Sequence, residues 1–218
     1  MKTLALFLGF SLAALTSIHR SATAQGFDRL GIKGGIGVAN FYGNDIKDTE
    51  RRTGLSLGGF VAYSFNRNLA LRLEVLYAQK GATLTGGNYD FIKYTLDYID
   101  IPLLLQYSLP TEGQVRLNLC IGPTLAILYS ARSAGQWSGL LAQPKEFIDA
   151  PRTTDMGVVF GAGVEFNIDG QPLMLEGRLG LGLSTIDTGE RTSFPAAPSG
   201  ADIRTSTISL MVAYSFWR

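Results

Sequence analysis

Strict alternation of apolar and polar residues is the feature of this sequence that most limits what it can fold into. Across residues 69–80, a face of leucine, valine and tyrosine alternates with a face that carries Arg72 and Glu74. The same period of two recurs in residues 96–108 and 115–130. Because successive side chains of a strand point to opposite faces, each segment is expected to form a β-strand with one aliphatic and one polar face.

Further segments with the same pattern bring the number of expected strands to eight. They are residues 29–41, 54–65, 154–166, 173–186 and 203–217. Strands of about 12 residues are long for a soluble sheet. They also exceed the roughly 9 to 11 residues that a tilted strand needs to cross a bilayer. The strand length therefore favours segments that span a membrane.

The joints between the expected strands alternate in length. Residues 66–68, 109–114 and 167–171 form short joints, whereas residues 42–53, 81–93, 131–153 and 187–202 form long ones. Short turns at one end and long loops at the other are typical of transmembrane barrels. The sequence therefore predicts an all-β, eight-stranded antiparallel up-and-down transmembrane β-barrel with short periplasmic turns and long extracellular loops.

Charged residues on the polar faces predict what fills the barrel. We expect nine of them to form a charge network in the lumen: Lys33, Arg72, Glu74, Asp100, Arg116, Asp155, Glu165, Glu176 and Arg178. Unpaired buried ions cost several kcal/mol each, so these side chains should neutralise one another. Because an eight-stranded barrel has an interior just wide enough for side chains, we expect a filled interior with at most a narrow pore.

The first 24 residues have the features of an export signal. Lys2 precedes an apolar stretch over residues 4–18, and Ala22-Thr23-Ala24 matches the small-x-small pattern of a cleavage site. We therefore expect a signal peptide at 1–24, removed on export, and a barrel domain at 25–218. His19 is the sole histidine, so the mature chain would lack the residue central to Ser-His-Asp hydrolysis and His-ligated zinc.

Composition narrows the function classes further. Lys and Arg total 19 against 18 Asp and Glu, which gives no electrostatic basis for binding nucleic acid. A single cysteine, Cys120, excludes an internal disulfide and Cys-cluster metal sites. We expect no catalytic residue, no cofactor and no metal, and thus no enzyme. Asp45, Asp48 and Glu50 remain as an alternative, a carboxylate-only hydrolase or a loose Ca²⁺ site, to a plain acidic loop.

Three stretches carry a family resemblance: LALRLEVLYAQKGA at 69–82, YIDIPLLLQY at 98–107 and GVVFGAGVEF at 157–166. They resemble the PorT-like, or porin-family, eight-stranded outer-membrane β-barrel proteins of Gram-negative bacteria. The residues that match the two most specific family motifs are Tyr77, Gln79, Lys80 and Gly81, and Tyr98, Asp100, Ile101, Pro102, Leu103 and Leu104. The resemblance implies a barrel fold in the cell outer membrane and brings no catalytic residues.

The expected role follows from a filled barrel with long outer loops. We expect a structural or surface-contact protein that acts in adhesion or ligand binding through its extracellular loops. Trp137 and Phe147, in the apolar loop 131–153, are the candidate contact residues. The expected partners are outer-membrane lipid and lipopolysaccharide, with an unknown surface ligand or protein, and the chain is expected to be a monomer.

The alternative is a soluble, secreted, lipocalin-like carrier of a small hydrophobic ligand. Such a carrier would turn its aliphatic face inward and its charged face to water. The two alternatives therefore make opposite predictions about which face of each strand is buried.

Overall fold

The computed structural model of the chain describes residues 26–42, 49–86, 89–109, 115–137, 140–146, 153–168, 170–184 and 204–217. The strands in these ranges are β1 (Gly26–Tyr42), β2 (Thr49–Ser64), β3 (Leu69–Gly86), β4 (Tyr89–Ser108), β5 (Val115–Trp137), β6 (Leu140–Glu146), β7 (Thr154–Ile168), β8 (Gln171–Gly182) and β9 (Arg204–Trp217). No helix in these ranges is long and apolar enough to cross a membrane.

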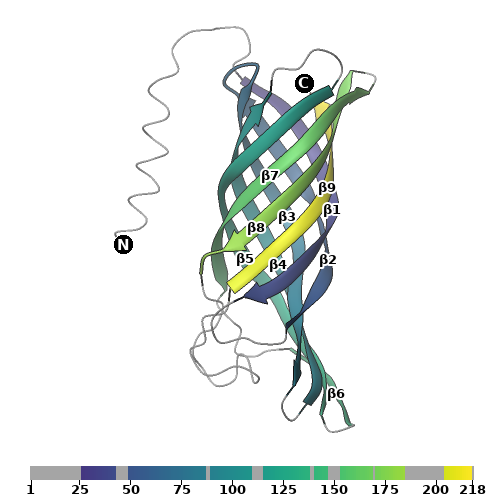
Figure 1. Cartoon of the computed structure of the whole chain (residues 1–218). Coiled ribbons are helices and arrows are strands. Elements are labelled where there is room, and N and C mark those ends of the chain that lie inside the picture. The colour runs from purple at the N-terminus through teal and green to yellow at the C-terminus, as the bar shows by residue number, and fades with distance from the viewer. Residues whose placement is uncertain are drawn as a thin grey trace, which may run out of the picture.

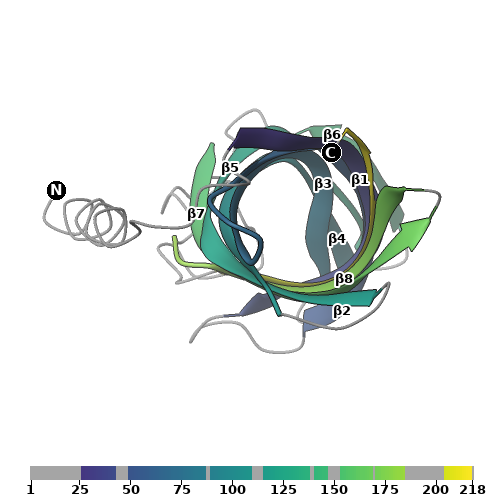
Figure 2. The ribbon, with the colours of Figure 1, turned by 90° about the horizontal axis from the view of Figure 1, so that it is seen from above.

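Eight of the strands close into a ring. Adjacent strands of the ring pair antiparallel in the order β1, β2, β3, β4, β5, β7, β8 and β9, and β9 pairs with β1 to complete the circuit. In the described part of the chain β6 pairs with β5 alone and lies outside the ring. Figure 1 shows the tilted strands from the side, and Figure 2 shows the closed ring end-on. The predicted eight-stranded antiparallel barrel is confirmed.

The strand boundaries correct the expectation of long loops at 81–93 and 131–153. β3 continues to Gly86 and β4 begins at Tyr89, so most of the first loop is a β-hairpin. β5 continues to Trp137, and β6 forms within the second loop. Backbone hydrogen bonds between the paired strands stabilise these extensions. Outside the bilayer such pairing needs no apolar face on the strand. The period-two pattern therefore ends before the strands do. The loop at 187–202 lies outside the described residues.

The wall of the barrel is apolar outside and polar inside. On β5, Leu117, Leu119 and Ile121 are 43%, 51% and 49% exposed, whereas Asn118 and Cys120 between them are 3% and 7% exposed. The same alternation runs along β3, β7 and β8. A continuous aliphatic exterior matches the hydrocarbon core of a bilayer. This sidedness is opposite to that of a lipocalin-like carrier, so the carrier alternative is not favoured.

Aromatic side chains gather at the end of the barrel with short turns. Exposed rings at the ends of their strands there are Tyr107, Phe166, Tyr214 and Phe216. Tyr63 makes edge-to-face contacts with Phe27 and Phe65, with ring centroids 5.4 and 5.3 Å apart. Amphipathic and aromatic rings are enriched where a membrane meets water. This end therefore has the character of the predicted periplasmic girdle.

A pair of substitutions on one face of β5 tests the membrane-facing exterior. Ile121→Arg places a charge near mid-height of the wall, whereas Tyr129→Arg, at a residue 77% exposed, places it near the loop end. In a bilayer the first should lower the free energy of unfolding by about 2–4 kcal/mol and the second by about 0–1 kcal/mol. Urea unfolding in phospholipid vesicles measures both. Equal losses for the two variants would contradict a membrane-spanning wall.

Candidate functional site

Five charged side chains meet in the middle of the barrel interior. We call Lys33, Arg72, Glu74, Glu176 and Arg178 the central cluster. Strand alternation places these residues inward, because Arg72 and Glu74 are two residues apart on β3 and Glu176 and Arg178 are two apart on β8. Lys33 reaches them from β1. All five residues are at most 7% exposed.

A bidentate ion pair between Glu74 of β3 and Arg178 of β8 connects opposite parts of the wall. Arg178 Nη1 donates to Glu74 Oε2 at 2.7 Å, and Nη2 donates to Oε1 at 2.6 Å. Charge-assisted bidentate pairs are among the strongest and most directional side-chain contacts. This pair therefore bridges the lumen between two strands that are not neighbours in the sheet.

Glu176 accepts hydrogen bonds from all three cations of the central cluster. Arg72 Nη2 donates to Glu176 Oε2 at 2.7 Å, Lys33 Nζ donates to Oε1 at 2.8 Å, and Arg178 Nε also donates to Oε1. Lys33 Nζ lies 3.2 Å from Glu74 Oε1 as well. Three cations therefore share two carboxylates, and each carboxylate contacts more than one cation.

Gly161 of β7 lies against the central cluster. A Cβ placed there would make ordinary van der Waals contact, at 3.5 Å, with Glu176 Oε1 and Arg178 Cγ, but it would collide with Cys120 Sγ of β5. The close approach of the Cys120 thiol, rather than the cluster itself, therefore favours a glycine here.

Polar side chains continue from the central cluster toward the short-turn end. Arg72 Nη1 donates to Gln106 Oε1 at 2.8 Å, and Gln106 Nε2 donates to Asn118 Oδ1 at 3.0 Å. Arg29 Nη1 pairs with Glu165 Oε2 at 2.6 Å beside a cavity of about 30 Å³. This end of the lumen is thus filled by paired polar groups with space for one or two waters.

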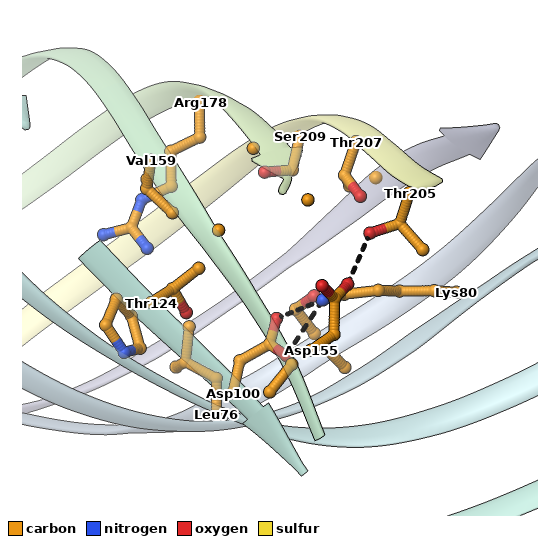
Figure 3. Close-up of a pocket in the computed structure, with 18 of the residues that line it drawn as sticks. Leu76, Lys80, Asp100, Thr124, Asp155, Val159, Arg178, Thr205, Thr207 and Ser209 are labelled. Atoms are coloured by element: carbon orange, nitrogen blue, oxygen red, sulfur yellow. Dashed lines mark hydrogen bonds and ion pairs between the residues drawn. The ribbon is translucent and has the colours of Figure 1, made fainter. Parts of the chain in front are cut away.

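The loop-side half of the lumen holds a larger cavity of about 70 Å³, which we call the outer chamber. Residues from all eight barrel strands line it, among them Lys80, Asp100, Thr124, Asp155 and Thr205, and Arg178 of the central cluster lies at its border (Figure 3). Lys80 Nζ is 2.9 Å from Asp100 Oδ1 and Oδ2. Thr205 Oγ1 donates to Asp155 Oδ2 at 2.9 Å. The central cluster therefore lies between two separate interior cavities.

The structure distributes the nine residues of the predicted lumen network over four places. Lys33, Arg72, Glu74, Glu176 and Arg178 form the central cluster, and Asp100 and Asp155 line the outer chamber. Glu165 pairs with Arg29. Arg116 lies opposite Glu165 in the β5–β7 register and outside the central cluster. For the loop candidates, Trp137 ends β5 but only its backbone is described, and Phe147 lies outside the described residues.

Sequence reasoning missed two ionic partners in the lumen, Arg29 and Lys80. The sequence contained the information needed, because residues an even number apart on a strand share a face. Arg29 shares a face with Lys33, and Lys80 shares a face with Arg72 and Glu74. Parity alone therefore places both side chains inside.

Within the described residues, no group of three or more His, Cys, Asp or Glu side chains is placed to hold a metal ion. Asp45 and Asp48 of the alternative Ca²⁺ or hydrolase site lie outside those residues, and of Glu50 only the backbone is described. Cys120 is a buried free thiol, 3.5 Å from Arg72 Nη2.

The closed ladder, the apolar exterior and the charged interior together define a membrane-spanning barrel of the outer-membrane class. A family profile described as "Outer membrane protein beta-barrel domain" matches residues 20–188. The chain therefore belongs to the outer membrane protein beta-barrel domain family, which supports a location in the outer membrane. No curated protein matches the sequence significantly.

Several solved outer-membrane structures are similar to this chain. OprG from Pseudomonas aeruginosa is 14% identical with a TM-score of 0.49, over 89% of this chain and 99% of OprG. Ail, the attachment invasion locus protein of Yersinia pestis, is 14% identical with a TM-score of 0.44, over 88% of this chain and 100% of Ail. Neisserial surface protein A is 15% identical with a TM-score of 0.44, over 86% of this chain and 97% of that protein. These similarities are too low to transfer a function.

Removing one carboxylate from the central cluster should destabilise the barrel strongly. Glu74→Gln leaves Arg178 without its bidentate partner, and breaking a buried ion pair typically costs about 3–5 kcal/mol. We expect a loss of about that size in urea unfolding from phospholipid vesicles. The control, Arg51→Gln on β2, neutralises one charge at an exposed position and should change stability by less than about 0.5 kcal/mol.

The double variant Glu74→Met with Arg178→Met tests whether the pair acts as a unit. Because it removes both charges together, its loss should be smaller than the summed losses of Glu74→Met and Arg178→Met measured singly. Strict additivity would mean that the two side chains stabilise the barrel independently, contrary to the geometry.

Proposed function

We propose that this chain is a PorT-like surface-contact protein of the outer membrane, exported by a cleaved signal at residues 1–24. It acts without catalysis, in adhesion or ligand binding, through the loop end of a monomeric barrel with a filled interior. Its partners in the membrane are lipid and lipopolysaccharide, and its loop end meets a surface ligand or protein.

The observation that carries this proposal is the unequal height of the wall. β4 and β5 have 20 and 23 residues, whereas β8 has 12. A tilted strand needs roughly 9 to 11 residues to cross a bilayer, so about half of β4 and of β5 extends beyond it. Figure 1 shows the ends of these strands, with β6, projecting past β1, β8 and β9. A β-sheet that projects on one side of the barrel mouth is suited to presenting a contact surface outside the cell.

The interior supports contact rather than transport. The central cluster spans the lumen between strands β1, β3 and β8, and its side chains are at most 5% exposed. A diffusing solute would have to separate several short ion pairs to pass. The barrel therefore offers at most a narrow ion path.

Removing the projection tests the contact role. In one variant, residues 133–146 are replaced by a short Gly-Asn-Gly turn, which deletes β6 and the outer end of β5. We expect retention of expressing cells on polystyrene, bare or coated with lipopolysaccharide, to fall to the level of cells that lack the chain. Counting retained cells after washing measures the effect.

The matched control replaces the short joint at residues 109–114, at the opposite end of the barrel, with a Gly-rich turn of equal length. Both variants must still change gel mobility on boiling and must be present in the outer-membrane fraction. If the first variant is folded there and retention is unchanged, the projecting sheet is not the contact surface.

Planar-bilayer recording of the refolded chain tests the filled interior. Because ion pairs close the lumen, we expect no large, stable conductance, and at most rare small openings. Large stable conductance from the unmodified chain would overturn the filled-barrel part of the proposal and favour a pore.

A further inference from the structure

The outer chamber contains an excess of negative charge. Among the described residues that line it, Asp100 and Asp155 are acidic, and Lys80, which pairs with Asp100, is basic. Arg178 also borders the chamber, but its guanidinium is held by Glu74 and Glu176 of the central cluster. The described lining of the chamber, Arg178 aside, therefore carries two carboxylates against one ammonium.

One of these carboxylates has an open hydrogen-bonding position. Asp155 is 3% exposed, and its Oδ2 accepts from Thr205 Oγ1, but its Oδ1 accepts from no described residue. The backbone N–H of Ser184, which donates to Met156 O at 3.3 Å, is also within hydrogen-bonding reach of this carboxylate, and Oδ1 is the oxygen that keeps an open position. Buried carboxylate oxygens are normally satisfied, so Oδ1 marks a place for a donor.

Strand register leaves space beside Asp155 Oδ1 and places further polar groups around that space. Asp100 of β4 and Asp155 of β7 lie opposite Ala126 of β5, one on each side. Two strand spacings separate the two acids by roughly 10 Å at the backbone, and the methyl group of Ala126 leaves the gap open. Thr124 Oγ1, two residues from Ala126 and also lining the chamber, has no described hydrogen-bond partner. Figure 3 shows Asp100, Thr124 and Asp155 around one space.

We propose that the outer chamber binds a small primary amine, whose ammonium group donates to Asp155 Oδ1 and Thr124 Oγ1 and is held by the charge of Asp155 and Asp100. This site goes beyond the surface-contact role, because it needs neither the projecting sheet nor its partner. Lys80 already shows the same recognition inside the chamber, where its ammonium group pairs with Asp100.

Size and charge limit the class of ligand. A cavity of about 70 Å³ holds on the order of five waters, so it fits an amine of a few heavy atoms. An anion would be repelled by the excess negative charge of the chamber. A divalent metal would lack ligands, since two separated carboxylates, one already paired, fall short of the 6 to 8 oxygens that Ca²⁺ takes.

Titration of the refolded, isotope-labelled full chain in detergent micelles tests the site. Methylammonium chloride is added at constant ionic strength, and backbone amide shifts are followed by NMR. We expect saturable shifts at residues near 100, 124, 155 and 205. Tetramethylammonium, which has no N–H donor, and CaCl₂ should produce none that saturate at these positions. Nα-acetyl-lysinamide separates a free small amine from a lysine side chain, and only weaker binding of this bulkier compound fits the proposal.

Two substitutions of opposite sign sharpen the test. Asp155→Asn removes the open carboxylate and should weaken methylammonium binding about tenfold or more, as expected for loss of a charged hydrogen bond. Lys80→Met removes the competing ammonium and should strengthen binding. Glu165→Gln, the same kind of charge change at the opposite end of the lumen, should leave it unchanged.

Heat-dependent gel mobility establishes that each variant is folded before titration. If Asp155→Asn does not fold, Lys80→Met and the comparison with tetramethylammonium still decide the question. Absence of saturable shifts in the unmodified chain, equal shifts with tetramethylammonium, or unchanged affinity in Lys80→Met would each overturn the proposal. The retention assay on cells is a separate readout, so failure of this site leaves the surface-contact proposal standing, and the reverse also holds.

Discussion

Closure of the hydrogen-bonded ladder is the constraint on which the rest of this structure depends. Hydrocarbon offers no hydrogen-bond partners, so every backbone N–H and C=O in the wall must pair within the protein. The pairing of β4 with β5, strands that a short joint connects, and of β1 with β9, from opposite ends of the chain, leaves the ring without an edge. Once the ring is closed, side chains must alternate between lipid and lumen.

The lumen of so small a ring is a demanding environment for charge. Lys33, Arg72, Glu74, Glu176 and Arg178 are removed from water, and they are compatible with the fold because each has partners at ion-pair distance. The cluster bridges β1, β3 and β8, so it links parts of the wall that the backbone ladder does not join directly. It also divides the lumen, with a small polar cavity at the turn end and the outer chamber at the loop end.

The two ends of the barrel consequently differ in the side chains and cavities that they offer for binding. The turn end is compact, with exposed aromatic rings and a paired Arg29 and Glu165. The loop end combines a chamber with an unsatisfied carboxylate oxygen on Asp155 and a sheet that projects on one side of the mouth. Both proposals, surface contact and amine binding, concern this end, yet they use different residues and are tested separately.

The fold class and the inward or outward direction of most wall residues follow from the sequence, because both depend on a period of two and on joint length. The bulge at Asp97 and Tyr98, where three consecutive residues are buried, does not follow from that period. The same alternation was available for Arg29 and Lys80, although neither was included in the predicted lumen network. Which charges meet depends on the folded ring: Lys33 and Glu176 are 143 residues apart, and their contact requires the tilt and register of the strands. The period-two pattern also did not predict β6 or the outer parts of β4 and β5. Outside the bilayer no apolar face is needed, and backbone hydrogen bonds between strands are enough to form the sheet.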